Sequence, residues 1–274
     1  MKKIILGASG MLGHMVFHYL KTDQSDIIPC SRSTASMGGL GGSLTRIPEY
    51  SEKQLSDLIQ QHRPCKVINC VGITNITESA KEIHLINSEL PVLVSEILDR
   101  KNDGSQLIQI STNGVFSGKR GNYVESDKPD ATDIYGQSKL KGEVARSPHL
   151  TIRASILGPE LKSKNGLLEW FLNQRKDING YTEVMWNGVT TLEYAKFIDW
   201  AIGQKLSGLI HLFSKKISKF DLLNLTKEVY EKKIKINPDG NIKSDKTLST
   251  ERLDVNYVVQ NHREMLLELK NLFC

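Results

Sequence analysis

The first 155 residues of the chain predict an α/β fold built on a doubly wound parallel sheet with helices on both faces. Short apolar runs alternate there with amphipathic stretches, and each run is apolar throughout instead of alternating polar with apolar positions. Continuous apolar strands indicate a sheet that is buried on both faces, and strand–helix alternation indicates parallel pairing. A glycine-rich turn directly after the first apolar run is the third observation, because such turns are typical of nucleotide-binding sheets.

The expected elements follow from the spacing of apolar residues. Five apolar runs are expected as strands, at residues 2–6, 27–30, 66–71, 107–111 and 150–155. Helical spacing predicts helices at residues 11–20, 52–61, 85–100 and 135–146. Beyond residue 155 the alternation is less regular, with helices expected at 166–175, 192–204 and 219–232 and short strands at 208–213 and 233–236. We therefore expect a smaller C-terminal α/β lobe beside the sheet.

Composition excludes several classes of protein. The chain has 274 residues, 39% of them hydrophobic and 24% charged, unlike disordered, collagen-like or disulfide-stapled chains. Its 36 lysines and arginines against 31 aspartates and glutamates give a net charge of +5, dispersed along the sequence. That charge suits an anionic small ligand. Nucleic-acid binding needs a concentrated basic surface, so no nucleic-acid partner is expected.

Signals for membrane insertion, secretion and metal binding are weak. No apolar run approaches the roughly 20 residues of a membrane-spanning helix, so no membrane partner is expected. The basic start of the chain resembles a signal peptide, but Gly7, Gly10 and Gly13 interrupt the apolar segment that would follow. The four cysteines show no CxxC spacing and no nearby histidine pair. We therefore expect no metal site and a cytoplasmic location.

The glycine-rich turn predicts a dinucleotide cofactor. Gly7 permits the tight turn, Gly10 lets the backbone approach a pyrophosphate, and Gly13 lets the following helix lie close to the sheet. The amino end of that helix offers free N–H groups to the anion. The residues expected to bind the cofactor here are Gly7, Ser9, Gly10, Met11, Leu12 and Gly13. The alternative is a glycine-bearing turn that binds nothing. Residues 1–155 are thus expected as a Rossmann-type NAD(P)-binding domain, and residues 156–274 mainly as a substrate-binding lobe with some segments returning to the sheet.

The end of the second strand indicates which cofactor is preferred. An acidic residue there would bind the adenosine ribose of NADH, but this chain has Ser31 and Arg32. Hydroxyl and guanidinium groups suit a 2′-phosphate, so NADPH is favoured and NADH stays possible. The alternative is that Arg32 is an ordinary solvated loop residue. The Ser- and Gly-rich stretch 31–43 is expected as a mobile loop and not as a phosphate site.

A catalytic set is predicted from four residues. Ser111 and Thr112 end the fourth strand, Tyr135 begins a helix, and Lys139 lies four positions later on the same helical face. A neighbouring ammonium lowers the pKa of a phenol, which lets it exchange protons near neutral pH. The lysine can also hold the nicotinamide ribose, and a strand-end hydroxyl can bind the substrate carbonyl. Tyr135 would then donate a proton while hydride is transferred. The alternative is a surface tyrosine and lysine on an ordinary helix.

This set resembles the Ser/Thr–Tyr–Lys constellation of the extended short-chain dehydrogenases/reductases. Asn69-Cys70-Val71-Gly72 matches the third-strand motif of that superfamily, and Asn87 falls where its helix carries a structural asparagine. Residues 110–143 are more similar to the dTDP-4-dehydrorhamnose reductase branch, which carries Ser-Thr, then Val-Phe, then Tyr-Gly-x-x-Lys-x-x-Gly-Glu. The resemblance implies that Cys70, Val71, Gly72 and Asn87 belong to the cofactor site together with Lys139.

The chain departs from that branch at Asn113-Gly114, where the branch carries Asp-Tyr at the sugar pocket. The resemblance therefore implies the reaction type but leaves the sugar open. The residues expected to bind substrate are Thr112, Asn113, Arg153, Trp186 and Asn187. For Arg153 a buried ion pair is the alternative, and for Trp186 a place in the core of the lobe.

The function that follows is an NADPH-dependent reductase of the 4-keto group of a nucleotide-activated deoxysugar. The substrate is expected to be dTDP-4-dehydrorhamnose or a UDP-linked 4-keto-6-deoxy sugar, and the pathway surface-polysaccharide or O-antigen synthesis. The alternatives are a nucleotide-sugar epimerase and a non-catalytic NAD(P)-binding regulatory subunit. The resemblance also implies a homodimer.

Overall fold

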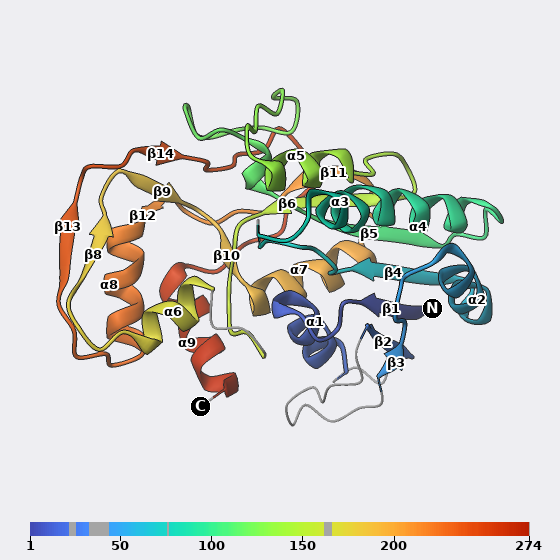
Figure 1. Ribbon diagram of the computed structural model, residues 1–274, viewed down its shortest axis with the longest axis horizontal. Helices are drawn as coiled ribbons and strands as arrows, with labels where there is room; N and C mark the ends of the chain where they lie inside the picture. The colour runs from blue at the N-terminus through green and yellow to red at the C-terminus, as the bar shows by residue number, and fades with distance from the viewer. Residues whose placement is uncertain (22–25, 33–43, 76, 162–165, 274) are drawn as a thin grey trace.

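A seven-stranded sheet forms the centre of the computed structural model, which describes residues 1–21, 26–32, 44–75, 77–161 and 166–273 (Figure 1). Its strands pair in parallel in the order β3-β2-β1-β4-β5-β6-β11. They are β1 (Lys2–Leu6), β2 (Ile27–Ser31), β3 (Thr45–Arg46), β4 (Cys65–Asn69), β5 (Gln106–Thr112), β6 (Leu150–Ala154) and β11 (Gly208–His211). The predicted parallel, doubly wound sheet is confirmed. Most of the expected loop 31–43 lies outside the described residues.

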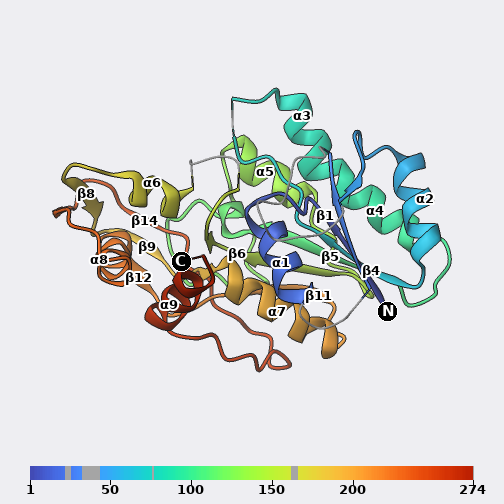
Figure 2. The ribbon, with the colours of Figure 1, turned by 90° about the horizontal axis from the view of Figure 1, so that it is seen from below.

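Each face of the sheet has its own apolar core, which explains why the strands are apolar throughout. On one face Ile5 packs with α1 and α7, and on the other Ile4 and Leu6 pack with α2 and α4. These helices are α1 (Met11–Lys21), α2 (Glu52–His62), α4 (Leu90–Asp99) and α7 (Thr191–Gly203). Figure 2 shows α1 and α7 together on one side of the sheet, with α2 and α4 on the other.

The strand order reverses between β1 and β4. From β1 the chain moves outward to β2 and β3, and then it returns to the other side of β1 and continues through β4, β5 and β6. Connections that leave the carboxyl ends of β1 and β4 therefore diverge and leave a crevice. Ligands of doubly wound sheets bind at this switch point.

The helical segment between β4 and β5 is longer and less regular than predicted. It consists of α3 (Ala80–His84), a π-helical turn (Leu85–Glu89) and α4, and it begins where the Ser79 hydroxyl accepts a hydrogen bond from the Glu82 amide at 3.1 Å. The π-helical turn contains Asn87. Such turns frequently occur at functional sites, because they redirect one side chain without ending the helix.

The helix predicted at 135–146 is shorter in the structure. It is α5 (Ile134–Lys141), and it ends at Gly142. A Cβ atom at Gly142 would lie 2.0 Å from the Asn87 carbonyl oxygen, so the chain passes too close to the neighbouring helical segment for a larger residue there. The boundary at residue 146 was therefore wrong because a tertiary contact ends the helix.

The remaining segments form a smaller α/β lobe, visible at the left of Figure 1. Its helices are α6 (Leu167–Asn173), α8 (Lys219–Val229) and α9 (His262–Phe273). Its short strands pair as β7 (Ile156–Leu157) with β10 (Val189–Thr190), β8 (Ile178–Tyr181) with β13 (Ile236–Asp239), and β9 (Val184–Trp186) with both β12 (Ile217–Ser218) and β14 (Ser244–Asp245). Of the later segments, α7 packs on the sheet and β11 pairs with β6 at its edge. The division at residue 155 stays a prediction.

The described residues contain neither a membrane-spanning helix nor a cluster of metal ligands. None of the helices within them has the length and hydropathy needed to cross a bilayer. Nowhere in the same part of the chain do three or more His, Cys, Asp or Glu side chains gather as metal ligands would.

Candidate active site

The turn after β1 has the close approach that its glycines predict. Gly7 has a φ of +76°, and its carbonyl oxygen accepts a hydrogen bond from the Gly10 amide at 2.9 Å. A Cβ atom at Gly13 would lie 2.1 Å from the same carbonyl oxygen. Only glycine at position 13 therefore lets α1 begin directly against the turn, which leaves the amino end of the helix facing the crevice.

A cavity of about 290 Å³ occupies the switch point. It is lined by the carboxyl ends of three strands and the residues that follow them: Gly7, Ser9, Gly10, Ser31, Arg32, Tyr50, Cys70, Val71 and Gly72. The Ser9 and Ser31 hydroxyls lie 2.8 Å apart and join two of its walls. Eight of these nine residues were predicted for the cofactor site. Of the other predicted cofactor residues, Leu12 is buried in the core behind the turn.

Tyr50 is the cavity residue that the sequence prediction missed. It follows β3, its backbone φ is +50°, and burial raises the pKa of its phenol to about 12. A single tyrosine outside any motif gives no signal in the sequence, because only the fold brings it to the cavity.

Arg32 lies at the mouth of the cavity, and its side chain is half exposed. Its Nη1 atom donates a hydrogen bond to Glu82 Oε1 at 3.3 Å. Both residues also line an adjoining cavity of about 240 Å³ beside Asn75 and Glu78. The guanidinium therefore lies between the two cavities and has one carboxylate partner.

Thr112 and Tyr135 come together at the carboxyl end of β5. Asp133 caps α5 by accepting a hydrogen bond from the Gly136 amide at 2.7 Å. A Cβ atom at Gly136 would lie 2.3 Å from the Gly114 carbonyl oxygen, so the helix sits directly on the turn that follows Thr112. This approach brings Tyr135 close to Thr112: a Cβ atom at Gly114 would lie 3.2 Å from Thr112 Oγ1 and 3.3 Å from a ring carbon of Tyr135.

The pKa of Tyr135 differs from the prediction. Burial raises the pKa, the neighbouring Thr112 hydroxyl lowers it, and the Asp133 carboxylate raises it, so that the result lies above the ordinary value for a phenol. The expected lowering by Lys139 was wrong, because the desolvation of the buried phenol dominates its pKa; the Lys139 ammonium donates a hydrogen bond to the Ile110 carbonyl oxygen at 2.6 Å. Tyr135 therefore keeps its proton at neutral pH.

Lys139 is buried beside the cofactor cavity. Burial lowers its pKa to about 8, against the opposing effects of Glu143 and Cys70. A Cβ atom at Gly72 would lie 3.7 Å from the Lys139 Nζ atom, so the ammonium reaches the cavity wall. Near neutral pH it remains mostly charged.

Asn87 connects the cavity with α5. Its Oδ1 atom accepts a hydrogen bond from the Ile73 amide at 2.9 Å, and its Nδ2 atom donates to the Ile73 carbonyl at 2.9 Å and to Ser138 Oγ at 3.0 Å. With these three contacts Asn87 fixes the loop after β4 against the helix that carries Tyr135 and Lys139. The structure thus gives it a positioning role.

Ser111 and Arg153 belong to a buried polar network around Glu143. The Ser111 hydroxyl donates to Glu143 Oε1 at 2.6 Å, and Arg153 donates two bonds of 2.8 Å to the same carboxylate. Arg153 Nη1 also lies 3.3 Å from His211 Nε2. Ser111 was expected as a catalytic residue and Arg153 as a substrate ligand, but their side chains are committed to Glu143. For Arg153 the alternative, a buried ion pair, is observed. Neither residue's partner was recognised from the sequence.

The other expected substrate residues are also held by the protein. Asn113 Nδ2 donates to the Lys246 carbonyl at 3.0 Å, and the Asn187 amide bonds both the carbonyl (2.7 Å) and the amide (3.0 Å) of Leu248. Trp186 is 4% exposed and lies in the core of the lobe, the alternative expected for it. These residues attach the segment around residue 247 to the sheet, so of the five only Thr112 directly faces Tyr135.

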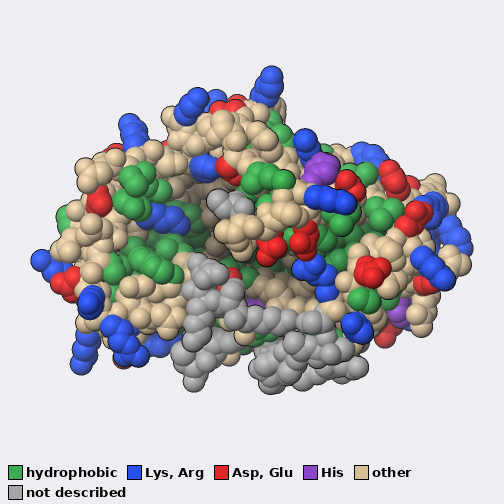
Figure 3. All heavy atoms as spheres, viewed as in Figure 1, with side chains coloured by type: hydrophobic (Ala, Val, Ile, Leu, Met, Phe, Trp, Pro, Cys, Tyr) green, Lys and Arg blue, Asp and Glu red, His purple; other side chains and the backbone are tan. Residues whose placement is uncertain are grey.

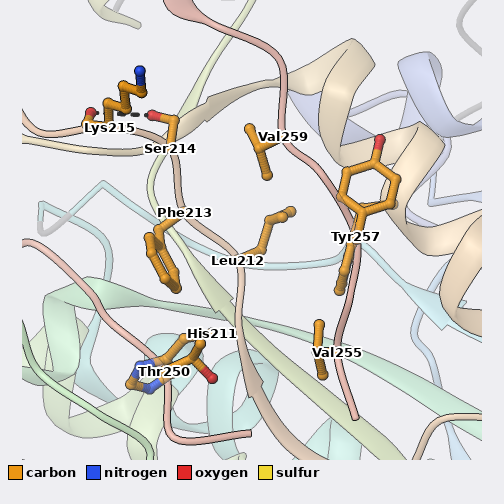
Figure 4. Close-up of a pocket in the computed structure, with 10 residues that line it drawn as sticks. His211, Leu212, Phe213, Ser214, Lys215, Thr250, Val255, Tyr257 and Val259 are labelled. Atoms are coloured by element: carbon orange, nitrogen blue, oxygen red, sulfur yellow. Dashed lines mark hydrogen bonds between the residues drawn. The ribbon is translucent and has the colours of Figure 1, made fainter. Parts of the chain in front are cut away.

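A second cavity, of about 410 Å³, lies beside β11, and none of the predicted site residues lines it. Figure 4 shows Val255, Tyr257 and Val259 on one wall and Leu212 and Phe213 on the other. It is therefore a separate hollow, whose lining also includes the polar residues His211, Ser214, Lys215 and Thr250.

Together, the sheet and the site define a Rossmann-type protein with a tyrosine, a lysine and a strand-end threonine at the carboxyl edge of the sheet. The family described as "RmlD substrate binding domain" matches residues 1–178, and the chain belongs to this family. The predicted resemblance is thereby confirmed.

Curated relatives match the first half of the chain. Methionine adenosyltransferase 2 subunit beta of Danio rerio is 30% identical over 146 residues, which is 51% of this chain and 42% of that protein. A dTDP-4-dehydrorhamnose reductase of Streptomyces griseus is 30% identical over 146 residues, covering 52% and 43%. The chain thus matches less than half the length of these relatives.

Solved structures match the whole fold. A dTDP-4-dehydrorhamnose reductase from Clostridium acetobutylicum superposes with a TM-score of 0.82 at 20% identity over 99% of both chains. A dTDP-4-dehydrorhamnose reductase from Bacillus anthracis in complex with NADP gives 0.80 at 21% identity, again over 99% of both. At these identities the likeness establishes the fold.

Proposed function

We propose that the chain is an NADPH-dependent reductase of the 4-keto group of a nucleotide-activated deoxysugar. The observation that carries the proposal is that Thr112 and Tyr135 both border Gly114, where a Cβ atom would lie 3.2 Å from Thr112 Oγ1 and 3.3 Å from a ring carbon of Tyr135, while the Lys139 ammonium reaches the wall of the switch-point cavity. The reductase from Streptomyces griseus and a probable dTDP-4,6-dihydroxy-2-methyloxan-3-one 4-ketoreductase from Streptomyces antibioticus, 31% identical over 149 residues, support it.

The residues of the switch-point cavity suit NADPH. Because Gly13 has no side chain, α1 begins directly against the turn after β1. Its amino end would then face a pyrophosphate, as in other dinucleotide sites. Ser31 and Arg32 would hold the 2′-phosphate, and Lys139 the nicotinamide ribose. When bound, NADPH supplies the hydride.

The chain's own residues supply the proton and orient the carbonyl. Because the pKa of Tyr135 is raised, the phenol is an acid at neutral pH, which is the form needed for reduction of a ketone. The Thr112 hydroxyl, which borders Gly114 together with the Tyr135 ring, would hold the same carbonyl oxygen from a second direction and stabilise the charge that develops there.

The surroundings of Thr112 are where the chain departs from the related branch. A Cβ atom at Gly114 would lie 3.2 Å from Thr112 Oγ1 and 3.3 Å from a ring carbon of Tyr135, so a larger residue at this position would make tight contacts with both side chains. We propose that dTDP-4-dehydrorhamnose or a UDP-linked 4-keto-6-deoxy sugar is the substrate. A spore coat polysaccharide biosynthesis protein of Bacillus subtilis, 27% identical over 146 residues, supports a role in polysaccharide synthesis.

The test follows NADPH absorbance with a panel of dTDP-, UDP- and GDP-linked 4-keto sugars, with NADH in parallel. We expect oxidation of NADPH with at least one dTDP or UDP sugar and weaker use of NADH. An inert panel with both cofactors would contradict the proposal.

A regulatory subunit is the second candidate, because the methionine adenosyltransferase relative is named as a subunit. The two candidates differ in what Tyr135 does. A reductase loses turnover in Tyr135→Phe but still binds NADPH, whereas a regulatory subunit has no turnover to lose. The same absorbance assay on both proteins therefore separates them.

A further inference from the structure

The Glu143 carboxylate lies where three parts of the candidate site meet. It follows the end of α5 by two residues. It accepts a hydrogen bond of 2.6 Å from Ser111 Oγ on β5 and two bonds of 2.8 Å from Arg153 on β6. Ser111 and Arg153 are paired directly across these two strands. One carboxylate therefore binds the carboxyl ends of two strands to the helix that carries Tyr135 and Lys139.

The proposed reaction does not use the ion pair of Glu143 and Arg153, although this pair is buried. The charged side chains seen in Figure 3 are spread over the surface, with basic and acidic groups interspersed, where water hydrates them. The side chains of Glu143 and Arg153 differ, because they are only 8% and 3% exposed. A buried ion pair is often no more stabilising than apolar residues of similar size, since both charges lose their hydration. Stability alone is therefore a poor explanation for this pair.

Glu143 is connected by short paths to two members of the reacting set. Thr112 directly follows Ser111 in β5, so the bond from Ser111 to the carboxylate fixes the backbone from which the Thr112 hydroxyl extends. Lys139 lies four positions before Glu143, and its ammonium donates to the Ile110 carbonyl oxygen at 2.6 Å. A displaced carboxylate would therefore move the end of β5 and the end of α5 relative to each other.

The charge of Glu143 also acts on Lys139. Burial lowers the pKa of the Lys139 ammonium to about 8. Two titratable groups oppose this lowering, first the Glu143 carboxylate from the end of α5 and then Cys70 from the end of β4. Without the carboxylate, the ammonium would lose its proton at lower pH, and a part of it would be neutral at pH 7.

We propose that Glu143 is a positioning residue for the reduction, which holds the Thr112 hydroxyl and the Lys139 ammonium in place at the carboxyl edge of the sheet. Arg153 is the counterion that allows the carboxylate to be buried there. The inference rests on the proposed function, because Thr112 and Lys139 are the groups that would hold the substrate carbonyl and the nicotinamide ribose. Glu143 acts only through these neighbours.

The first test measures the protonation of Lys139 in the protein without cofactor or substrate. Lysines labelled with ¹³C at Cε are titrated by NMR, and the Lys139 signal is the one that Lys139→Arg removes. We expect Glu143→Gln to lower the midpoint of this titration by about one pH unit, because a neighbouring negative charge is lost. Glu52→Gln is the matched control, since Glu52 forms an exposed pair with Arg100, and it should leave the midpoint unchanged.

The second test separates turnover from cofactor affinity. Ser111→Ala breaks the link from Glu143 to β5 but keeps the carboxylate. We expect its kcat to fall by about tenfold or more, since a displaced Thr112 hydroxyl no longer meets the substrate carbonyl correctly. Its Kd for NADPH and its Lys139 titration should match wild type. In Glu143→Gln, NADPH affinity should begin to weaken at lower pH than in wild type.

A double variant keeps the inference testable if Glu143→Gln fails to fold. The single variant leaves the Arg153 guanidinium buried without its partner, whereas Glu143→Gln combined with Arg153→Met removes both charges. The Lys139 midpoint should fall in the double variant as well, because the carboxylate is missing from both. An unchanged midpoint in every foldable variant, or a wild-type kcat in Ser111→Ala, would overturn the inference.

These outcomes are distinguishable from failure of the reductase assignment. A lower Lys139 midpoint, with NADPH affinity that weakens at lower pH, in a protein that reduces no keto sugar would sustain the action of Glu143 on Lys139 and refute the reaction. Turnover by wild type, together with an unchanged midpoint in Glu143→Gln, would sustain the reaction and refute the positioning role.

Discussion

The two halves of the candidate site are built differently. The cofactor cavity is formed largely by backbone and small side chains, such as Gly7, Ser9 and Gly72, which leave space for a ligand. On the substrate side, the polar side chains of Ser111 and Arg153 both bind the Glu143 carboxylate, so the protein itself occupies their hydrogen-bonding groups. The comparison teaches that a glycine motif predicts a cavity directly, whereas a cluster of polar residues predicts a network in which few members remain available for a ligand.

The largest effect is expected at Tyr135, which with Thr112 remains available to a ligand on the substrate side. Tyr135→Phe removes the proton donor and keeps the ring, so we expect kcat to fall by about 10²–10⁴-fold. NADPH affinity should not change, because the cavity lies on the other half. A stopped-flow titration of NADPH beside the turnover assay separates the two effects. Loss of NADPH binding in this variant would show that the halves are not separate.

The buried network is tested by stability. Arg153→Met leaves the Glu143 carboxylate buried without its main partner, and we expect the free energy of unfolding to fall by about 3–5 kcal/mol. Arg263→Met is the control, because the Arg263–Glu228 pair is exposed and contributes less than about 1 kcal/mol. Urea denaturation followed by circular dichroism measures both. Equal, small losses would mean that Arg153 is available to substrate after all.

The cofactor half is tested at Gly13. Because an added Cβ would meet the Gly7 carbonyl oxygen, Gly13→Ala should cost about 1–3 kcal/mol of stability and displace the turn, weakening NADPH binding. Gly203→Ala is the matched control, since nothing lies within 4 Å of a Cβ there. Fluorescence titration with NADPH checks the prediction. A Gly13→Ala protein that binds NADPH with wild-type affinity would show that the close contact between α1 and the Gly7 carbonyl oxygen is not needed for cofactor binding.

The pH dependence tests Lys139. Its pKa in the folded protein is lowered to about 8, so the charged form predominates below that pH and is lost as the pH rises through it. We expect kcat/KM for NADPH, at saturating keto sugar, to fall above about pH 8. Lys139→Arg keeps its charge and should move the fall to higher pH. A flat profile in wild type would exclude a role for the ammonium.

The smallest expected effect is at the cofactor's 2′-phosphate. Arg32→Ala should raise KM for NADPH by about tenfold and leave KM for NADH unchanged. Glu82→Gln removes the carboxylate that now pairs with Arg32, and we expect a lower KM for NADPH by a few-fold, as for an exposed ion pair. Steady-state kinetics with both cofactors measure the ratio. Equal changes for NADH and NADPH would contradict the assignment.

The elements that could be predicted are those marked by residues close together in the sequence, such as apolar runs and turn glycines. Apolar runs predicted β1, β2, β4, β5 and β6 within one or two residues, and the turn chemistry of Gly7 and Gly13 predicted the cavity. The two-residue strands of the lobe are too short to show a periodic pattern of apolar residues. For example, β7 forms because β10 lies beside it. Those pairings depend on contacts between distant segments.

The site was predictable to the same extent. Thr112, Tyr135 and Lys139 follow from position and spacing, and the structure brings them together. The role of Glu143 does not follow, because its partners Ser111 and Arg153 are 32 and 10 residues away. The pKa of Tyr135 was predicted with the wrong sign, because spacing along a helix does not reveal that burial of the phenol dominates its pKa.

The most direct test of the reductase assignment is transfer of isotope. NADPH deuterated at the transferring position of the nicotinamide is incubated with a dTDP- or UDP-linked 4-keto-6-deoxy sugar, and the product is examined by mass spectrometry and NMR. We predict one deuterium at C4 of the sugar with wild type and almost none with Tyr135→Phe over the same time. A product without deuterium at C4, or equal transfer by both proteins, would contradict the assignment.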